Sequence, residues 1–202
     1  MMYIKKILCI LLTIVLFIVV YLYRPETFHI KSQRVVVDTV EDLKNNSEYI
    51  IKGQFVSDIE TVKINDQEDY RIYDFIIDEI YKGKPLNQKT ITVAQRKYLY
   101  KDYSPMGRIS IKDELYIQPI INLSKDYVIF VKYDQNTDRF YPATEPFLAI
   151  LDNQKLILQS NLMTKNISNQ KYYNGIKYIQ VKYDYQKIKD FSNTFTLDDL
   201  KK

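Results

Sequence analysis

The sequence predicts a mainly β protein of the α+β class. We expect an N-terminal transmembrane helix followed by a small OB-like β-barrel or sandwich with short flanking helices. Three observations support this class. Aromatic residues make up 14% of the 202 residues, with 19 Tyr and 9 Phe, whereas only 4 residues are Gly. Tyr, Phe, Ile and Val are enriched in strands. One long apolar segment lies near the N-terminus, and several short segments with strand-like alternation follow it.

The apolar segment ILCILLTIVLFIVVYLY, residues 7–23, carries no charge. At about 1.5 Å per residue, seventeen helical residues span roughly 25 Å, slightly less than a hydrocarbon core of about 30 Å. Tyr21, Tyr23 and Arg24 can extend the helix into the membrane interface. The segment therefore predicts a bilayer contact through residues 7–23.

The flanking residues favour an uncleaved signal anchor, residues 1–24, over a cleaved signal. Cys9 lies near the start of the apolar segment and follows Leu8, whereas a lipoprotein cysteine follows a small residue at its end. The sequence VVYLYRPETFH lacks the small residues that a signal peptidase requires. Lys5 and Lys6 precede the segment and favour a cytoplasmic N-terminus. We expect a single-pass protein of the cell membrane with an extracellular C-terminal domain.

Charge and cysteine content limit the function classes. The formal net charge is +4, and Lys5 and Lys6 supply two of these charges. Such a weakly basic balance argues against a nucleic-acid-binding domain. Cys9 is the single cysteine, so the extracytoplasmic part can form no internal disulfide. Its stability must come from its core, which a domain of about 175 residues can supply.

Beyond the anchor, the sequence predicts a stalk and one domain. Residues 24–34 (RPETFHIKSQR) are polar and contain Pro25, which is typical of a short stalk, so we expect a stalk over residues 25–37. Residues 38–202 show no repeat and no second boundary, so we expect a single extracytoplasmic β-rich domain.

Two short helices are expected at the ends of this domain. Asp38 and Glu41 have the spacing of a capping box, which predicts a helix that ends near Asn45 and Asn46. Near the C-terminus the sequence reads TLDDLKK, in which Thr196 is expected to cap a last helical turn.

The first half of the domain shows two strands with special positions. In SEYIIKGQFVSD, Gly53 interrupts an apolar face, which predicts a bend or a crowded neighbour. In YRIYDFIIDEIYK the alternation changes phase, which predicts a bulge between Ile76 and Asp78. TITVAQ predicts a further short strand. Residues 96–114 contain Pro105 and Gly107 and are expected to form the longest loop.

The second half predicts a central strand and a hairpin. DYVIFVKY is apolar on both faces, which indicates a central strand. FLAILDNQKLILQ predicts a hairpin that turns at Asp152 and Asn153. ELYIQPI and YIQVKYDY predict two more strands.

Several of these segments carry a family resemblance. Residues 48–55 (EYIIKGQF), residues 77–83, TITV and DYVIFVKY resemble a pattern in poorly characterised membrane-anchored envelope proteins of low-GC Gram-positive bacteria. The resemblance covers residues 38–135, and its motifs are strand cores and turns. It implies a small OB-like or related barrel outside the membrane and no particular chemistry.

The clearest pattern beyond the core is an interleaving of aromatic and basic residues in residues 96–103 and 171–189. Tyr rings with nearby cations suit sugars, anionic wall polymers, lipid headgroups or single strands. The alternative is that Tyr serves as a strand former and Lys protects exposed edges. The candidate ligand-binding residues are Arg96, Lys97, Tyr98, Tyr100, Lys101, Tyr103, Tyr178 and Lys182.

These patterns predict a non-catalytic binding module of the cell envelope, with anionic wall polymers or an envelope protein as partner. No catalytic residue, metal site or cofactor is predicted. His29 is the single histidine and lies in the predicted stalk, away from any second catalytic group. Residues 65–69 and 134–138 are acidic, but they lack the Gly and Glu of a calcium loop and are expected to be hairpin tips.

Two alternative functions remain open at this stage. One is an envelope enzyme that uses carboxylates such as Glu145, because the apolar neighbours in YPATEPF can desolvate this acid and raise its pKa. The other is a structural accessory subunit of a membrane complex.

Overall fold

The structure, a computed structural model, describes residues 2–23, 26–31, 35–65, 68–103, 107–112, 121–160, 163, 170–173, 178–184 and 195–201. In this part the chain is mainly β, as predicted. It forms two compact units, Met1–Lys31 with Ser168–Asp184, and Ser32–Ile167 with Tyr185–Lys202. The sequence predicts one domain after the anchor. Each unit brings together segments that are distant in the sequence, which a linear composition pattern does not reveal.

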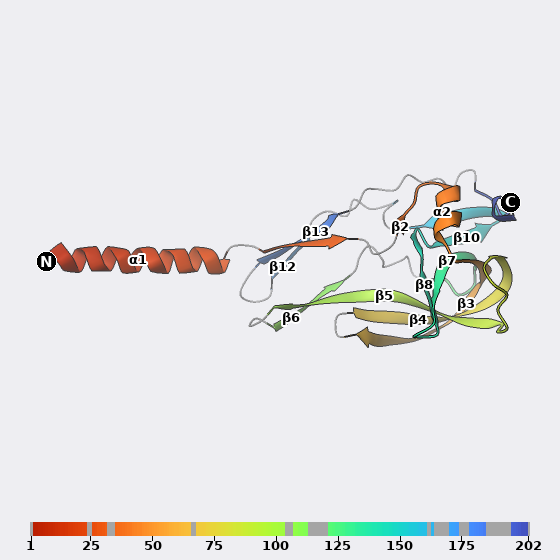
Figure 1. Cartoon of the computed structure of the whole chain (residues 1–202), viewed down its shortest axis with the longest axis horizontal. Helices are drawn as coiled ribbons and strands as arrows, with labels where there is room; N and C mark the ends of the chain where they lie inside the picture. Colours follow the sequence, from red (N-terminus) through yellow and green to blue (C-terminus); the bar gives the residue numbers. More distant parts are fainter. Residues whose placement is uncertain are drawn as a thin grey trace. The chain divides into compact units, whose positions relative to one another are not determined.

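The first unit consists of a helix and a three-stranded sheet. The helix α1 (Met2–Tyr23) is drawn as one continuous helix in Figure 1. Strand β1 (Glu26–Lys31) pairs in parallel with β13 (Tyr178–Asp184), which pairs antiparallel with β12 (Gln170–Tyr173). Residues 26–31 therefore form a strand where the sequence predicts a stalk. The predicted strand YIQVKYDY is confirmed by β13.

The side chains of α1 are exposed along its apolar segment. The large apolar residues from Ile7 to Val20 have exposed fractions between 44% and 71%. In the part of the chain that the structure describes, no helix combines the length and the apolar character needed to cross a membrane.

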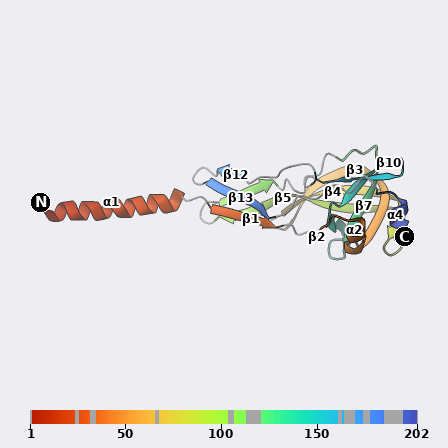
Figure 2. The same cartoon turned by 90° about the horizontal axis from the view of Figure 1, so that it is seen from above.

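The second unit contains the other strands and two short helices. These elements are β2 (Val35–Val36), α2 (Val40–Asn46), β3 (Tyr49–Asn65), β4 (Glu68–Lys82), β5 (Thr90–Tyr103), β6 (Gly107–Lys112), β7 (Asp126–Asp134), β8 (Arg139–Pro142), β9 (Thr144–Glu145), β10 (Leu148–Asp152), β11 (Lys155–Gln159) and α4 (Asp198–Lys201). The main sheet has the order β11-β10-β7-β3-β4-β5-β6, and β2 pairs with β9. Figure 2 shows the long strands of this sheet from a second direction.

Strand β8 closes a circuit of five strands. It pairs antiparallel with β7 and makes one parallel contact with β5, between Val93 and Phe140. The strands β3, β4, β5, β8 and β7 are thus each paired with the next, and β7 pairs with β3 again. The Phe55 ring packs inside this circuit against the rings of Phe75 and Tyr127, with centroid distances of 4.8 and 5.3 Å.

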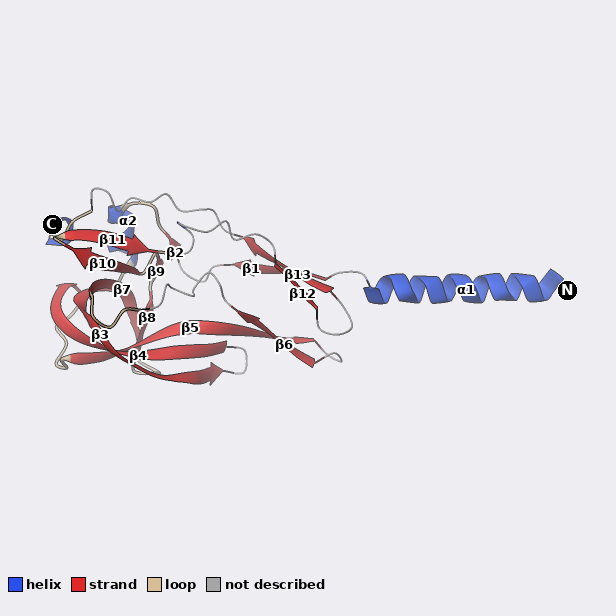
Figure 3. Ribbon diagram, turned by 180° about the vertical axis from the view of Figure 1, so that it is seen from behind, coloured by secondary structure: helices blue, strands red, loops and turns tan. Residues whose placement is uncertain are grey.

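Strand β7 separates two cores, which confirms the prediction of a central strand. Ile129 belongs to the core inside the circuit, and Phe130 belongs to a second core on the other side of the sheet. The second core contains Leu43 of α2 and Leu200 of α4. In Figure 3, α2 lies beside the strands β10 and β11. Because both faces of β7 are buried, its sequence shows a continuous apolar run.

Local predictions on β3 and β4 are confirmed. A Cβ atom at Gly53 would lie 1.9 Å from the carbonyl oxygen of Ile76, so the neighbouring strand leaves no room for a side chain. On β4, Ile77 and Glu79 have partners on β3 and Asp78 is passed over, which is the predicted bulge. Asn65 pairs with Glu68 and Asp134 pairs with Arg139 across antiparallel strands, as expected beside hairpin tips, and residues 66 and 67 lie outside the described residues.

Two predicted boundaries shift by one residue. The cap of α2 is Thr39, whose Oγ1 accepts a hydrogen bond from the Asp42 N–H at 3.1 Å, and it is not Asp38. The helix ends at Asn46, as predicted. The β10–β11 hairpin turns at Asn153 and Gln154, both with positive φ angles of 47° and 73°. The prediction placed this turn one residue earlier.

Other predictions have mixed outcomes. Before α4, the backbone N–H and the hydroxyl of Thr196 both donate to the Asp199 carboxylate at 2.8 Å, which confirms the last helical turn. The predicted long loop, residues 96–114, is wrong, because residues 90–103 and 107–112 form the hairpin β5–β6. Pairing with β4 and with each other stabilises these polar strands. The predicted strand ELYIQPI lies outside the described residues.

Candidate functional site

The candidate site lies where the sheet β3-β4-β5-β6 continues beyond the closed circuit. On β4, Phe75 and Tyr73 belong to the core, and Arg71 and Asp69 occupy the next positions on the same face. Directly paired residues of an antiparallel sheet share a face. We call this outer continuation of the core-facing side the distal face. Its positions are Asp58, Thr61, Lys63, Asp69, Arg71, Gln95, Tyr98, Tyr100, Asp102, Arg108, Ser110 and Lys112.

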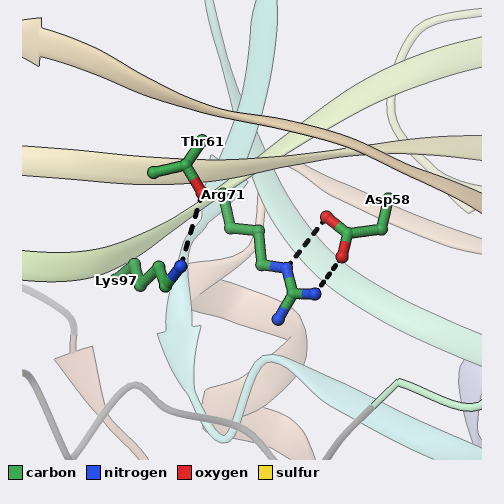
Figure 4. Close-up of polar contacts among 4 residues, drawn as sticks. All are labelled: Asp58, Thr61, Arg71 and Lys97. Atoms are coloured by element: carbon green, nitrogen blue, oxygen red, sulfur yellow. Dashed lines mark hydrogen bonds and ion pairs between the residues drawn. The ribbon is translucent and has the colours of Figure 1, made fainter.

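An ion pair lies at the start of the distal face. Arg71 donates through Nε to Asp58 Oδ1 at 2.8 Å and through Nη2 to Asp58 Oδ2, so the contact is bidentate (Figure 4). The Arg71 guanidinium also lies 5.6 Å from the centroid of the Tyr73 ring. The hydrogen bonds from Arg71 lower the pKa of Asp58, and the positive charges of Arg71 and Lys97 add to this effect against a smaller opposing effect of burial.

The Arg71 side chain remains accessible. It is 45% exposed, and Asp58 is 36% exposed. Among the described residues, its third nitrogen, Nη1, has no hydrogen-bond partner in the protein. Arg71 is therefore a cation held in a fixed orientation by Asp58 and Tyr73, with donor capacity left for a ligand.

Lys97 reaches the distal face from a β-bulge. Arg96 pairs with Tyr70 and Tyr98 pairs with Asp69, so Lys97 is the extra residue of β5. Its ammonium donates to the hydroxyl of Thr61 at 3.4 Å across the intervening strand (Figure 4). The bulge changes the phase of β5, and for this reason Tyr98 shares a face with Arg71.

Arg96 lies on the opposite face and differs from the exposed cation that the sequence pattern predicts. Its side chain is 6% exposed and its Nη1 lies 2.7 Å from Oε1 of Glu68. The Tyr70 hydroxyl donates to the same carboxylate at 3.1 Å, and its ring contacts that of Tyr141 edge to face at 5.6 Å. Burial and the charge of Glu68 raise the pKa of Tyr70. Arg96 thus belongs to a buried polar cluster between β4, β5 and β8.

The remaining predicted residues of β5 are divided between the two faces of the strand. Tyr98 and Tyr100 occupy distal-face positions, whereas Lys101 and Tyr103 occupy positions on the opposite face. The sequence pattern placed all four on one surface. The side chains of these four residues lie outside the described part, so their placement here is that of the backbone.

Tyr178 and Lys182 lie in the other unit of the chain. Both are on β13, four residues apart and therefore on one face of that strand, and Lys182 pairs with His29 of β1. The predicted set of eight residues is therefore divided among the distal face, the opposite face and β13.

Glu145, the carboxylate of the alternative enzyme hypothesis, is buried. Its exposed fraction is 0%, and the hydroxyl of Ser160 donates to its Oε1 at 2.5 Å. Its backbone pairs with Val36 of β2 and its carbonyl accepts from the N–H of Val37 at 3.1 Å. These contacts anchor the segment before the domain to its core. Within the described residues, no group of three or more His, Cys, Asp or Glu side chains is placed to hold a metal ion.

The sequence pattern missed several distal-face residues. Three of them lie on strands whose sequence patterns indicate only an alternation of apolar and polar residues: Asp58, Thr61 and Arg71. Two others lie in the predicted loop: Arg108 and Lys112. Strand pairing assembles them, and a single sequence carries no direct signal of pairing. No family model and no curated protein matches the chain in comparisons of its sequence with known proteins.

Proposed function

We propose that the protein is a non-catalytic binding module of the cell envelope that α1 attaches to the membrane. The observation that carries this proposal is the distal face. The strands that line the core continue beyond it and present charged, polar and aromatic residues that the core does not use. A positioned, accessible cation such as Arg71 is suited to recognition of an anionic or hydroxylated ligand.

The strand order supports an OB-like barrel. In chain order, the five strands of the circuit are β3, β4, β5, β7 and β8, and the third and fifth make the parallel contact. OB-folds are five-stranded, partly open barrels that bind oligosaccharides and oligonucleotides across their second and third strands. Here these strands are β4 and β5, which carry Arg71, Lys97 and Tyr98.

The exposed apolar side chains of α1 support attachment to a bilayer. A helix with apolar residues on all sides is stable in lipid and is costly to leave in water. Lys5 and Lys6 at one end favour a cytoplasmic N-terminus, so the β-rich part of the chain is proposed to be extracellular. A single pass through residues 7–23 is the proposed arrangement.

Membrane fractions from cells that express the full chain test this arrangement. We expect the protein to resist extraction by alkaline carbonate, and protease added to intact spheroplasts to remove the β-rich part. Release by carbonate, or a mature protein in the medium that lacks residues 1–23, would contradict the anchor.

The binding function is tested with the full chain in nanodiscs. We expect it to sediment with purified Gram-positive cell walls and to lose this binding when the anionic polymers are extracted from the walls. Empty nanodiscs are the control. A protein that does not sediment with intact walls would contradict the proposal.

The enzyme alternative has less support in the contacts of Glu145. A carboxylate with no exposed surface that accepts a hydrogen bond from Ser160 has no access to a substrate in this conformation. Glu145→Gln keeps the shape of the side chain and is expected to leave wall binding unchanged while lowering stability. Loss of a hydrolytic activity on wall polymers in this variant, with stability retained, would instead favour the enzyme. An accessory-subunit role has no specific observation in its favour.

A further inference from the structure

The basic residues of the extended sheet are concentrated on one hairpin. Strands β5 and β6 carry five cations beyond the circuit, whereas Asp102 is the single acid there; the cations are Arg96, Lys97, Lys101, Arg108 and Lys112. The neighbouring parts of β3 and β4 are mainly acidic; they carry Asp58, Glu60, Lys63, Glu68, Asp69, Arg71 and Asp74. The sheet therefore has an acidic half and a basic half.

The register of β6 divides the basic half by face. Lys112 lies opposite Tyr98, Ser110 lies opposite Tyr100, and Arg108 lies opposite Asp102. These pairs occupy distal-face positions, and Figure 1 shows the two strands side by side. Lys101 and Tyr103 occupy the other face with Ile109 and Ile111. One face of the hairpin thus carries two tyrosines, a serine, two cations and the acid Asp102, and the other is mainly apolar.

The spacing of the two cations of β6 limits the size of the ligand. Arg108 and Lys112 are four residues apart, so their positions are separated by roughly 14 Å at about 3.4 Å per residue. A single small anion cannot contact both. On the adjacent strand, Tyr98 lies opposite Lys112, and Tyr100 lies opposite Ser110, between the two cations; both are positions where rings can stack on sugar or polyol units. A chain with repeated anions and hydroxylated units fits this row.

We propose that the ligand is a phosphate-bearing polymer of polyol or sugar units, and that it binds along the distal face of β5–β6 through Tyr98, Tyr100, Arg108 and Lys112. This inference rests on the proposed binding function and specifies its ligand class. All four residues come from residues 96–114, the segment that the sequence predicts to be a loop. Arg71 adds a further cation on the same face, two strands away from β6.

The two faces of the hairpin supply a matched test. The full chain in nanodiscs is titrated with poly(glycerol phosphate), and Lys112→Gln is compared with Lys101→Gln. Each variant removes one positive charge from the same hairpin. We expect Lys112→Gln to weaken binding about 5-fold, as for one cation near an anionic surface, and Lys101→Gln to stay within about 2-fold. Equal losses in the two variants would overturn the assignment to one face.

A second pair separates stacking from charge. Tyr100→Leu is expected to weaken binding about 5-fold or more, whereas Tyr103→Leu, on the opposite face, is expected to bind like the unchanged protein. Lys112→Arg should retain binding, and thermal unfolding of each variant confirms that it is folded. If Tyr100→Leu binds as well as the unchanged protein, the proposed contact is overturned.

The probes separate this inference from the function on which it rests. Neutral dextran of similar length is expected not to bind, and oligo(dT) of matched charge is expected to bind more weakly than poly(glycerol phosphate). Equal binding of dextran would overturn the requirement for phosphate, and tighter binding of oligo(dT) would overturn the polymer class. Wall binding that persists without any poly(glycerol phosphate) binding overturns the ligand class alone. Absence of binding to walls overturns the proposed function.

Discussion

Two arginine–carboxylate pairs on the same sheet have different environments. Arg71 and Asp58 lie on the distal face with side-chain exposures of 45% and 36%, whereas Arg96 and Glu68 lie on the opposite face with 6% and 12%. Each pair joins an arginine to a carboxylate across neighbouring strands, β4 and β3 in the first and β5 and β4 in the second. The comparison shows that the face of a strand, and not the residue type, decides whether an arginine can serve a ligand.

The physical difference between the pairs is desolvation. A buried charge loses its hydration and depends on its partner, so removal of one member leaves the other uncompensated. An exposed pair remains hydrated and contributes little to stability. Arg96 is therefore expected to matter for folding, and Arg71 is free to exchange protein contacts for ligand contacts.

The largest expected effect is that of Arg96→Gln. The change leaves the Glu68 carboxylate buried without its cation, and we expect the free energy of unfolding to fall by about 3 kcal/mol. Urea denaturation of the full chain in detergent measures this loss. A loss below about 1 kcal/mol would remove the distinction between the two pairs.

Tyr70→Phe is expected to have an intermediate effect on the buried side. It removes the hydroxyl that donates to Glu68 at 3.1 Å but keeps the ring that contacts Tyr141. The expected loss of stability is about 1 kcal/mol, the value of one hydrogen bond in a partly buried site. Tyr141→Phe, which removes the hydroxyl donor to Thr137 on the same ring pair, is the comparison variant. No measurable loss in Tyr70→Phe would argue that the cluster around Glu68 depends on Arg96 alone.

Arg71→Gln is expected to change stability by less than about 1 kcal/mol, because the pair with Asp58 is exposed. The same change is expected to reduce the affinity for poly(glycerol phosphate). Arg71→Lys keeps the charge and loses the bidentate geometry, so it distinguishes charge from orientation. A large loss of stability in Arg71→Gln would show that the distal face is structural.

The smallest effect concerns pH. Because Arg71 lowers the pKa of Asp58 in the folded state, the pair contributes stability above the unfolded pKa of about 3.9, and this contribution is lost as the pH falls through the lower folded pKa. The stability difference between the unchanged protein and Asp58→Asn should be constant from about pH 7 to pH 5 and should shrink below about pH 4. Denaturation curves at several pH values measure it. A difference that grows on acidification would contradict the assigned sign.

Local sequence signals predicted much of the fold. Gly53 indicated a crowded neighbour because no other residue leaves that space, and the phase change in β4 indicated the bulge at Asp78. The apolar run of β7 indicated burial on both faces. Acidic segments indicated the hairpin turns, and capping residues indicated the helix ends, each within about one residue. These features depend on backbone sterics and burial within a few residues, so a single sequence records them.

Other features were decided by partners distant in the sequence. The polar segment around Pro105 has the composition of a loop, yet residues 107–112 pair with β5. The stalk-like residues 26–31 pair with β13, about 150 residues later in the chain. Amino-acid composition does not encode which strand a segment pairs with. These two strands could therefore not be predicted from the sequence pattern.

The candidate site shows the same division. The sequence by itself determined that Tyr, Lys and Arg alternate along residues 96–103, and that an uncharged segment precedes a cysteine-free, β-rich chain. Only the tertiary structure decided that Arg96 is buried against Glu68, that the bulge at Lys97 moves Tyr98 to the face of Arg71, and that β6 brings Lys112 to the same row. The physical reason is that side-chain faces follow from strand register, and register is fixed by burial and pairing across the whole sheet.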